Sequence, residues 1–217
     1  MTNRESTGTT LAQRERHALA DLFNAVGPDA PTLCAGWSAR DLAAHLVLRE
    51  GHPAAVGIAI RPFASWTSHT QASLSHGDYG QLVERFRSGP PLLSAMRLPH
   101  ADAAMNTFEH FVHHEDVRRA SLDWLARELT PDDQQVLWQQ LVKRARWYLR
   151  SSPVPLLLVA PDFGAIEIGH GRDDLVTLTA PPPELVLHIH GRRAHADVEV
   201  TGPGSARDKW EQHEQRG

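Results

Sequence analysis

The sequence predicts an α plus α/β protein: a four-helix bundle over residues 1–150, followed by a small α/β domain over residues 151–217. Between residues 9 and 150, apolar residues recur at helical spacing over long segments. From Ser151 onward the chain changes to short β-like runs separated by Pro and Gly. The 217 residues also provide enough length to bury a substantial core. We therefore expect a domain boundary between Ser151 and Pro155.

The first expected helix covers residues 9–26 and ends at Gly27 and Pro28. In the segment GWSARDL, Ser38 is suited to cap a second helix from about residue 39, because Asp41 follows three residues later as in a capping box. Residues 62–77 have a loop-like composition. The remaining helices of the bundle are expected over residues 78–88, 102–127 and 131–150.

The C-terminal part contains four β-like runs with the sequences VPLLLVA, AIEIGH, DLVTLTA and HADVEVTG. In the last run Ala196, Val198 and Val200 alternate with polar residues, which is typical of a strand with one buried face. The intervening segment PPPELVLHIHGRR is compatible with a short helix or with a strand. These features indicate a small sheet with one or more covering helices.

Composition excludes several classes of protein. The formal net charge is -4 and arginines alternate with acids, so we expect no nucleic-acid binding. The single cysteine, Cys34, excludes an internal disulfide and a multi-thiolate zinc site. The N-terminal MTNRESTGTT lacks the apolar core of a signal peptide, and no apolar run is long enough to span a bilayer. We expect a cytoplasmic protein without membrane contact.

The stretch MNTFEHFVHHEDVRR, residues 105–119, concentrates titratable groups on a predicted helix. At 100 degrees per residue, His113 lies about 40 degrees from Glu109, and Asp116 about 20 degrees on its other side. These three residues therefore share one stripe with apolar neighbours. His110 and His114 fall on the flank, where we expect them to be solvated. A carboxylate and an imidazole at i and i+4 present two ligands to one divalent metal.

The third ligand is expected from the facing helix. Leu42, His45, Leu46 and Arg49 follow the spacing i, i+3, i+4 and i+7, so His45 lies in the middle of a buried face. His45 with the Glu and His of the later helix would form a two-His, one-carboxylate set from two helices of a bundle. Such a set leaves coordination positions open for water or substrate.

Each ligand has a simpler structural interpretation. His45 is compatible with a core histidine bound to a backbone carbonyl, and Glu109 with a buried ion pair to an arginine. Arg49 either pairs with Asp116 or Glu109, or anchors a substrate carboxylate. Asp116 is expected to orient a metal ligand or to pair with an arginine. We take Arg49 and Asp116 as the candidate catalytic residues.

Cys34 and His52 are further neighbours of the expected site. Cys34 precedes the capping segment and either approaches the metal as an additional ligand or is a small buried apolar residue. His52 follows two turns after His45, but the adjacent Gly51 and Pro53 leave its orientation open.

The segment GWSARDLAAHL, with Trp37, Asp41 and His45 at the spacing W-x-x-x-D-x-x-x-H, and the later EHFVHHED resemble the mycothiol-dependent maleylpyruvate isomerase family. The resemblance implies a DinB-like metal-binding helical bundle over most of residues 8–150. It also implies a divalent metal, often zinc, held by His45, Glu109 and His113. The C-terminal part is similar to the small sterol-carrier-like domain that often follows this bundle. In the family the metal binds a low-molecular-weight thiol, chiefly mycothiol, as a thiolate.

The resemblance favours a metal- and thiol-dependent isomerase or S-transferase, with a small-molecule thiol and an electrophilic substrate as its partners. A hydrolase that uses metal-activated water is an alternative, with Asp116 or His52 as its general base. The second alternative is a non-enzymatic, metal-stabilised protein that binds a ligand. Zinc is the first candidate, but His and carboxylate ligands also suit Ni, Fe and Mn. The oligomeric state stays open, a homodimer included.

Overall fold

The computed structural model describes residues 9–55, 60–91, 99–171 and 173–214. The chain divides into two compact units, Met1–Leu125 and Ala126–Gly217. The first unit is helical and the second contains a small mixed sheet with helices, so the expected combination of an α part and an α/β part is confirmed at this level. Within the described residues, we find no helix long and apolar enough to cross a membrane.

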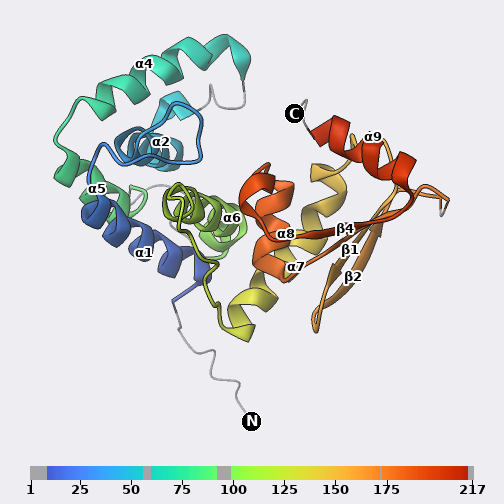
Figure 1. The fold of residues 1–217 in the computed structure, drawn as a ribbon. Helices are drawn as coiled ribbons and strands as arrows, with labels where there is room; N and C mark the ends of the chain where they lie inside the picture. Colours follow the sequence, from blue (N-terminus) through green and yellow to red (C-terminus); the bar gives the residue numbers. More distant parts are fainter. Residues whose placement is uncertain (1–8, 56–59, 92–98, 172, 215–217) are drawn as a thin grey trace. The chain divides into compact units, whose positions relative to one another are not determined.

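The N-terminal unit is built from helices that pack on one another (Figure 1). Helix α1 contacts α5 and α6, and α2 contacts α1, α4 and α5. The helices are α1 (Leu11–Val26), α2 (Ala39–Gly51), α4 (Ala64–Ser75), α5 (Tyr79–Ser88) and α6 (Pro99–Arg118), with short 3₁₀ turns at Pro53–Ala55 and Arg61–Phe63.

Local sequence determines where the site-bearing helix α2 begins. Ser38 accepts a hydrogen bond from the backbone N–H of Asp41, and the Asp41 carboxylate accepts from the Ser38 backbone N–H. This reciprocal capping box satisfies two amide groups that a helix start would otherwise leave without partners. The expected cap is confirmed, and it fixes the phase in which α2 presents His45 to the interior.

An apolar core joins these helices. Its members come from α1, α2, α5 and α6 and are almost fully buried, among them Leu19, Phe23, Leu42, Leu46, Leu82, Phe86 and Val117. Phe23 and Phe86 meet edge to face, with ring centroids 6.1 Å apart. This core holds α2 in place beside the other helices, and so determines where the polar side chains of its other positions lie.

A second buried cluster is charged. Arg16 stands in the apolar stripe of α1, and its guanidinium lies 2.8 Å from Glu50 and 3.2 Å from Asp102. His110 Nε2 lies 2.6 Å from the same Glu50 oxygen. Burial raises the pKa of Glu50, but the hydrogen bond from His110 and the charges of His110 and Arg16 outweigh it and lower that pKa. Helices α1, α2 and α6 are therefore connected by ion pairs as well as by apolar contacts.

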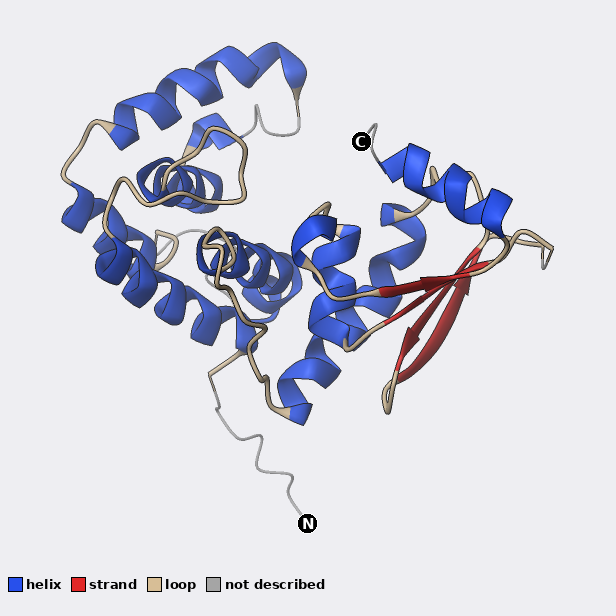
Figure 2. Ribbon diagram, viewed as in Figure 1, coloured by secondary structure: helices blue, strands red, loops and turns tan. Residues whose placement is uncertain are grey.

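The C-terminal unit contains a four-stranded sheet in the order β2-β1-β3-β4 (Figure 2). β1 pairs with β2 and β3 with β4 in antiparallel fashion, whereas β1 and β3 are parallel. Each of the four expected runs overlaps one strand, with β2 beginning one residue before its run. The strands are β1 (Leu156–Ala160), β2 (Gly164–Ile168), β3 (Val176–Thr179) and β4 (Glu199–Thr201).

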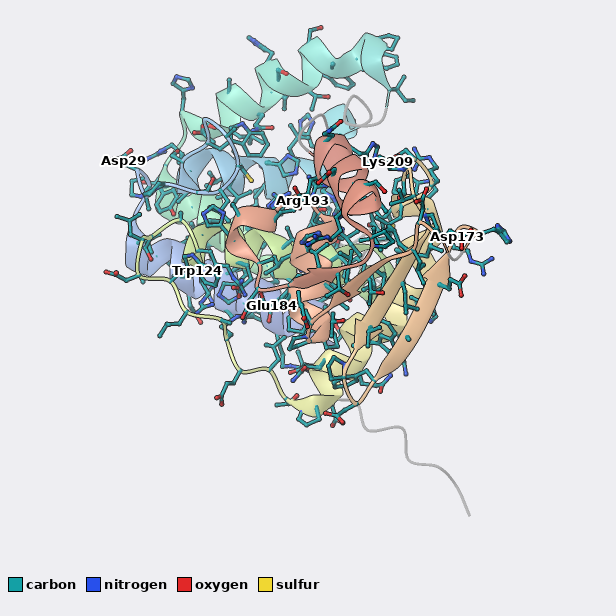
Figure 3. All side chains as sticks on the ribbon, turned by 45° about the vertical axis from the view of Figure 1, so that its right-hand side comes forward. Asp29, Trp124, Asp173, Glu184, Arg193 and Lys209 are labelled. Carbon is teal, nitrogen blue, oxygen red and sulfur yellow. The ribbon has the colours of Figure 1, made fainter. Side chains whose placement is uncertain are left out.

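Helices pack on this sheet. α7 (Pro131–Tyr148) contacts α8 and β2, α8 (Pro182–Ile189) contacts β1, and α9 (Gly204–Glu214) contacts β3. The segment PPPELVLHIHGRR, for which the sequence left two states open, thus contains a helix. The ring of His188 in α8 stacks on Trp210 of α9, with centroids 6.5 Å apart. Glu184, also in α8 and labelled in Figure 3, accepts a hydrogen bond from the backbone N–H of Asp197.

Two expectations for the helices differ from the structure. Residues 64–75 form α4 rather than a loop, although the helix lacks a side-chain N-cap. α6 ends at Arg118 instead of near residue 127. Beyond Arg118 the chain turns. The Arg119 guanidinium lies over the ring of Trp124, 4.5 Å from its centroid. Trp124 is labelled in Figure 3.

The division between the units also lies earlier than the boundary expected near residue 150. Leu137, Trp138 and Leu141 of α7 are buried. This helix packs against α8 and β2, which belong to the C-terminal unit. The switch from helical to β-like sequence at Ser151 therefore marks a change of secondary structure within one unit. The periodicity of α7 shows that one face is buried, but it carries no information about the partner.

This difference predicts where a protease cleaves. Leu122 and Leu125 are 101% and 78% exposed in the connection between α6 and α7. We expect limited chymotrypsin digestion to cut there first, as detected by mass spectrometry of the fragments. A fragment of residues 1–125 should melt cooperatively, whereas residues 1–150 should be less soluble because the apolar face of α7 is uncovered. Initial cleavage at residues 151–155, leaving α7 with the N-terminal fragment, would contradict this division.

Candidate metal centre

The three sequence-predicted ligands meet between α2 and α6. His45 comes from α2, while Glu109 and His113 lie one turn apart on α6. One ligand atom from each lies within 4.8 Å of the others. The three side chains are half-buried, with 15%, 23% and 12% of their surface exposed, so the group is reached from solvent on one side. That these residues bind a metal stays a prediction, but the fold brings them together.

The distances fit a small tetrahedral ion. His45 Nε2 lies 3.4 Å and His113 Nε2 3.3 Å from Glu109 Oε1. Ligands at about 2.0–2.1 Å from a tetrahedral zinc are separated from each other by about 3.3–3.4 Å. The ring centroids of His45 and His113 are 5.6 Å apart and the rings are steeply inclined. The donor types, and the two distances from Glu109, therefore suit a divalent ion such as zinc.

Glu109 is the centre of the cluster. Its Oε1 faces both imidazoles and also lies 3.1 Å from Arg49 Nε. Burial acts to raise the pKa of Glu109, but hydrogen bonds from His113 and His45, together with the charges of His113 and Arg49, hold that pKa well below 4.5. The carboxylate is therefore ionised at neutral pH, as a metal ligand must be.

Arg49 is engaged by protein groups through all three of its nitrogens. Besides the contact with Glu109, it donates from NH1 to Asn106 Oδ1 at 2.6 Å and from NH2 to the Met105 carbonyl at 3.2 Å. Of the two roles that the sequence left open, these contacts support the ion pair with Glu109. Arg49 is a positioning residue for the Glu109 carboxylate in this arrangement.

Asp116 lies behind His113. Its side chain is fully buried, and Oδ2 lies 2.8 Å from His113 Nδ1. A carboxylate that is hydrogen-bonded to Nδ1 orients the imidazole ring and leaves Nε2 directed at Glu109. The Asp116 backbone carbonyl also accepts a hydrogen bond from Leu33, at 3.0 Å. The geometry supports the orienting role considered for Asp116 from the sequence.

The pKa of His113 reflects this surrounding. Burial lowers the pKa, but hydrogen bonds with Asp116, Cys34 and Glu109 and the negative charge of Glu109 outweigh it and raise the pKa of His113 well above 6.5. Before an ion can bind at Nε2, a proton must leave this ring. Proton and metal therefore compete for the same nitrogen.

Sequence reasoning misjudged two neighbouring histidines. His110 and His114, expected to be solvated, are 0% and 6% exposed. His110 Nδ1 lies 2.8 Å from the Ala12 carbonyl, and His114 Nδ1 lies 2.7 Å from Glu15. Both rings fill the contact of α6 with α1, which shows that α6 is buried on more than the stripe facing α2. One feature of the sequence could have indicated this second buried face: Arg16 is a charged residue within the apolar stripe of α1.

Cys34 lies close to the candidate centre, as expected if it is an additional ligand rather than only a small buried apolar residue. Its Sγ lies 3.2 Å from Asp116 Oδ2 and 3.7 Å from His113 Nδ1. These three residues form a second group of metal-ligand type, with donor atoms all within 4.8 Å of one another. His52, another sequence candidate, lies with its ring 6.4 Å from that of Trp66.

A cavity of about 310 Å³ lies beside the centre, between the start of α2 and α4. Its wall combines polar and apolar surface and is formed by Gly36, Trp37, Asp41, Ser68, Gln71, Ala72 and Ser75. The Trp37 ring lies 5.0 Å from that of His45, so one residue borders both the cavity and the cluster. The volume is at the lower end of small-molecule sites, about 300–1,000 Å³.

Comparison with known proteins gives a likeness of fold. The sequence matches no protein-family profile. No curated protein matches it either. Among solved structures, the crystal structure of the mycothiol-dependent maleylpyruvate isomerase matches with a TM-score of 0.58, at 15% sequence identity. The match covers 88% of this chain and 90% of that chain, so the two proteins share their fold over nearly the whole length.

The cluster predicts which substitutions abolish metal binding. In a Cys34→Ser background, so that the nearby thiol supplies no ligand, His45→Ala, Glu109→Ala and His113→Ala should each abolish stoichiometric zinc. Asp116→Asn should weaken zinc by only about 10- to 100-fold, because it affects the orientation of a ligand. His76→Ala, at an exposed position on α4, is the matched control. Calorimetry and elemental analysis measure both effects.

His110→Ala and His114→Ala should retain zinc but lower the free energy of unfolding by about 1–3 kcal/mol, because each leaves a buried carboxylate short of a partner. Full zinc binding by the Glu109 variant would show that another carboxylate completes the site.

The pKa shifts predict how metal binding depends on pH. The raised pKa of His113 stabilises the metal-free fold below the unfolded value, and this contribution is lost as pH rises through the folded pKa. The lowered pKa of Glu109 stabilises the fold above its unfolded value, and this is lost as pH falls. Zinc affinity should therefore begin to decrease at a pH above 6.5 as the solution is acidified.

The measurement compares melting temperatures with and without a chelator. At about pH 8 and zinc at a hundredfold excess over its dissociation constant, binding contributes about 2.7 kcal/mol, so chelation should lower the melting temperature by several degrees. At about pH 5 the chelator should have little effect. Equal effects at both pH values would count against a site with two histidines.

Proposed function

We propose that this protein is a divalent-metal-binding enzyme that uses a low-molecular-weight thiol, as an isomerase or S-transferase of the maleylpyruvate isomerase family. The observation that carries the proposal is the His45, Glu109 and His113 cluster, whose Glu109 oxygen lies 3.3 and 3.4 Å from the two imidazole nitrogens. The fold shared with a mycothiol-dependent enzyme supports it. Zinc is the preferred ion and mycothiol or a similar thiol the cosubstrate.

A divalent ion held by these residues would supply a Lewis acid that favours the thiolate form of a bound thiol. The protein's own groups set the conditions for this chemistry. Arg49 neutralises part of the Glu109 charge and holds its oxygen toward the imidazoles. Asp116 would keep the His113 Nε2 lone pair directed into the cluster by accepting a hydrogen bond from Nδ1–H.

The cavity next to Trp37 would receive the polar part of the thiol. Its wall offers the Ser68 and Ser75 hydroxyls and the Gln71 amide, groups that form hydrogen bonds with hydroxyl and amide groups of a ligand. The cluster then lies beyond Trp37, where the sulfur of such a ligand and an electrophilic second substrate would meet.

Neither alternative has a comparable observation in its favour. A hydrolase would need a general base at the open side of the cluster. Asp116 instead faces His113 Nδ1 and Cys34, and His52 lies beside Trp66. A purely structural metal site would fit closed, four-ligand coordination better than three half-buried ligands beside a cavity.

A calorimetric screen tests the proposal with mycothiol, bacillithiol, glutathione and coenzyme A. Each thiol is titrated into zinc-loaded protein, metal-free protein and the Glu109→Gln variant. We expect one thiol to bind the zinc-loaded protein alone, with release of a proton. Binding of no thiol, or equal binding to the metal-free protein, would contradict the proposal.

Ser68→Trp, which fills the cavity, should weaken binding of that thiol at least about tenfold without changing the zinc content, since zinc has no ligand there. Ser65→Trp, at an exposed position of α4 that does not line the cavity, is the matched control. Unchanged thiol affinity in the Ser68 variant would place the thiol elsewhere.

A further inference from the structure

The imidazole of His113 has a different set of groups on each of its two nitrogens. Nε2 faces Glu109, whereas Nδ1 faces Asp116 and Cys34. We propose that Cys34 Sγ, His113 Nδ1 and Asp116 Oδ2 form a second cation site, selective for thiophilic divalent ions such as Cd²⁺. This site shares His113 with the cluster of His45, Glu109 and His113 but uses the other ring nitrogen, and it does not depend on the function proposed for that cluster.

The separations of the three donors are close to those around a tetrahedral ion. Sγ lies 3.2 Å from Asp116 Oδ2 and 3.7 Å from His113 Nδ1, and the latter two atoms are 2.8 Å apart. Around zinc, with metal–sulfur bonds of about 2.3 Å and metal–nitrogen or –oxygen bonds of about 2.0–2.1 Å, sulfur would lie about 3.5 Å from nitrogen or oxygen, and nitrogen about 3.3 Å from oxygen. An ion of the size of zinc therefore requires movements of about half an ångström or less.

Two of the donors are held by the surrounding fold. The Asp116 side chain is fully buried on α6, and its backbone carbonyl is bonded to Leu33 of the loop that carries Cys34. Within this loop, the Cys34 backbone N–H donates to Thr32 Oγ1 at 3.2 Å. A buried carboxylate directed at both a thiol and an imidazole is the feature that distinguishes this group from an isolated cysteine.

The choice of ion follows from the donors. A thiolate is a soft ligand that favours zinc-like and heavier d¹⁰ ions, whereas the first cluster offers nitrogen and oxygen alone. When an ion binds, the Cys34 thiol releases its proton to solvent, and the resulting thiolate and the Asp116 carboxylate balance the double charge of the ion. No electron is transferred in this step.

The two sites compete for one ring. A neutral imidazole has a lone pair on one nitrogen and a proton on the other. An ion at Nδ1 therefore leaves the proton on Nε2 and removes His113 from the first cluster. A thiophilic ion would act as an antagonist of the metal at the first cluster, through a shared residue.

The experiment uses the full-length His45→Ala/Glu109→Gln variant, which lacks two ligands of the first cluster. Because Cys34 is the single cysteine of the chain, any thiolate-to-cadmium charge-transfer absorption reports on it. We expect one equivalent of Cd²⁺ to bind with this absorption band. Adding Cys34→Ser should remove the band and weaken Cd²⁺ binding at least about 100-fold, with Asp116→Asn weakening it to a lesser degree.

Near-ultraviolet circular dichroism and melting curves establish that each variant is folded, and an unfolded double variant is replaced by His45→Ala alone. A folded variant that binds Cd²⁺ without the charge-transfer band would overturn the proposal. So would undiminished Cd²⁺ affinity after Cys34→Ser. Either result leaves the thiol-binding test of the first cluster unaffected, because that test uses zinc-loaded protein with the first cluster intact.

Discussion

The structure of the centre depends on one constraint: the Glu109 carboxylate is placed between two helices and must be compensated there. His45 from α2, His113 from its own helix and Arg49 from α2 all lie within 3.4 Å of its Oε1. Removing one partner of a buried ion pair typically costs about 3–5 kcal/mol, because the remaining charge keeps its desolvation penalty. Because the charge of Glu109 needs these partners, both imidazoles are directed at its Oε1, and a divalent ion would fit at this point.

This compensation continues into the core. Arg49 donates to Asn106, Asn106 donates to Asp102, and Asp102 contacts Arg16, which contacts Glu50. A chain of polar contacts thus runs from the candidate metal centre to the charged cluster shared by α1, α2 and α6. Such connected groups hold one another in a single arrangement, since each donor and acceptor is fixed by the next. The cluster of charges has a structural role in presenting Arg49, and through it Glu109.

The sequence was sufficient to predict which three side chains meet between α2 and α6, because their placement obeys local rules. Helical spacing places Glu109 and His113 on one stripe, and the confirmed capping box at Ser38 sets the phase of α2 that directs His45 inward. These are properties of single helices. The contacts of Cys34 depend instead on how a loop lies against α6, and no local pattern encodes that.

The expectations for His110, His114 and α7 differ from the structure because they depend on contacts between helices. The burial of His110 and His114 follows from α1 packing on a second face of α6, and the place of α7 follows from its contact with α8. Apolar periodicity shows that a face is covered, but not which element covers it. All the helices expected before residue 151 were therefore assigned to one bundle, although the last belongs with the sheet.

The most direct test of the central claim is the X-ray absorption spectrum of zinc-loaded Cys34→Ser protein, from which the one thiol has been removed. We predict a shell of nitrogen and oxygen atoms at about 2.0–2.1 Å, with the outer scattering that two imidazole rings produce. A shell of oxygen atoms without imidazole scattering would contradict it.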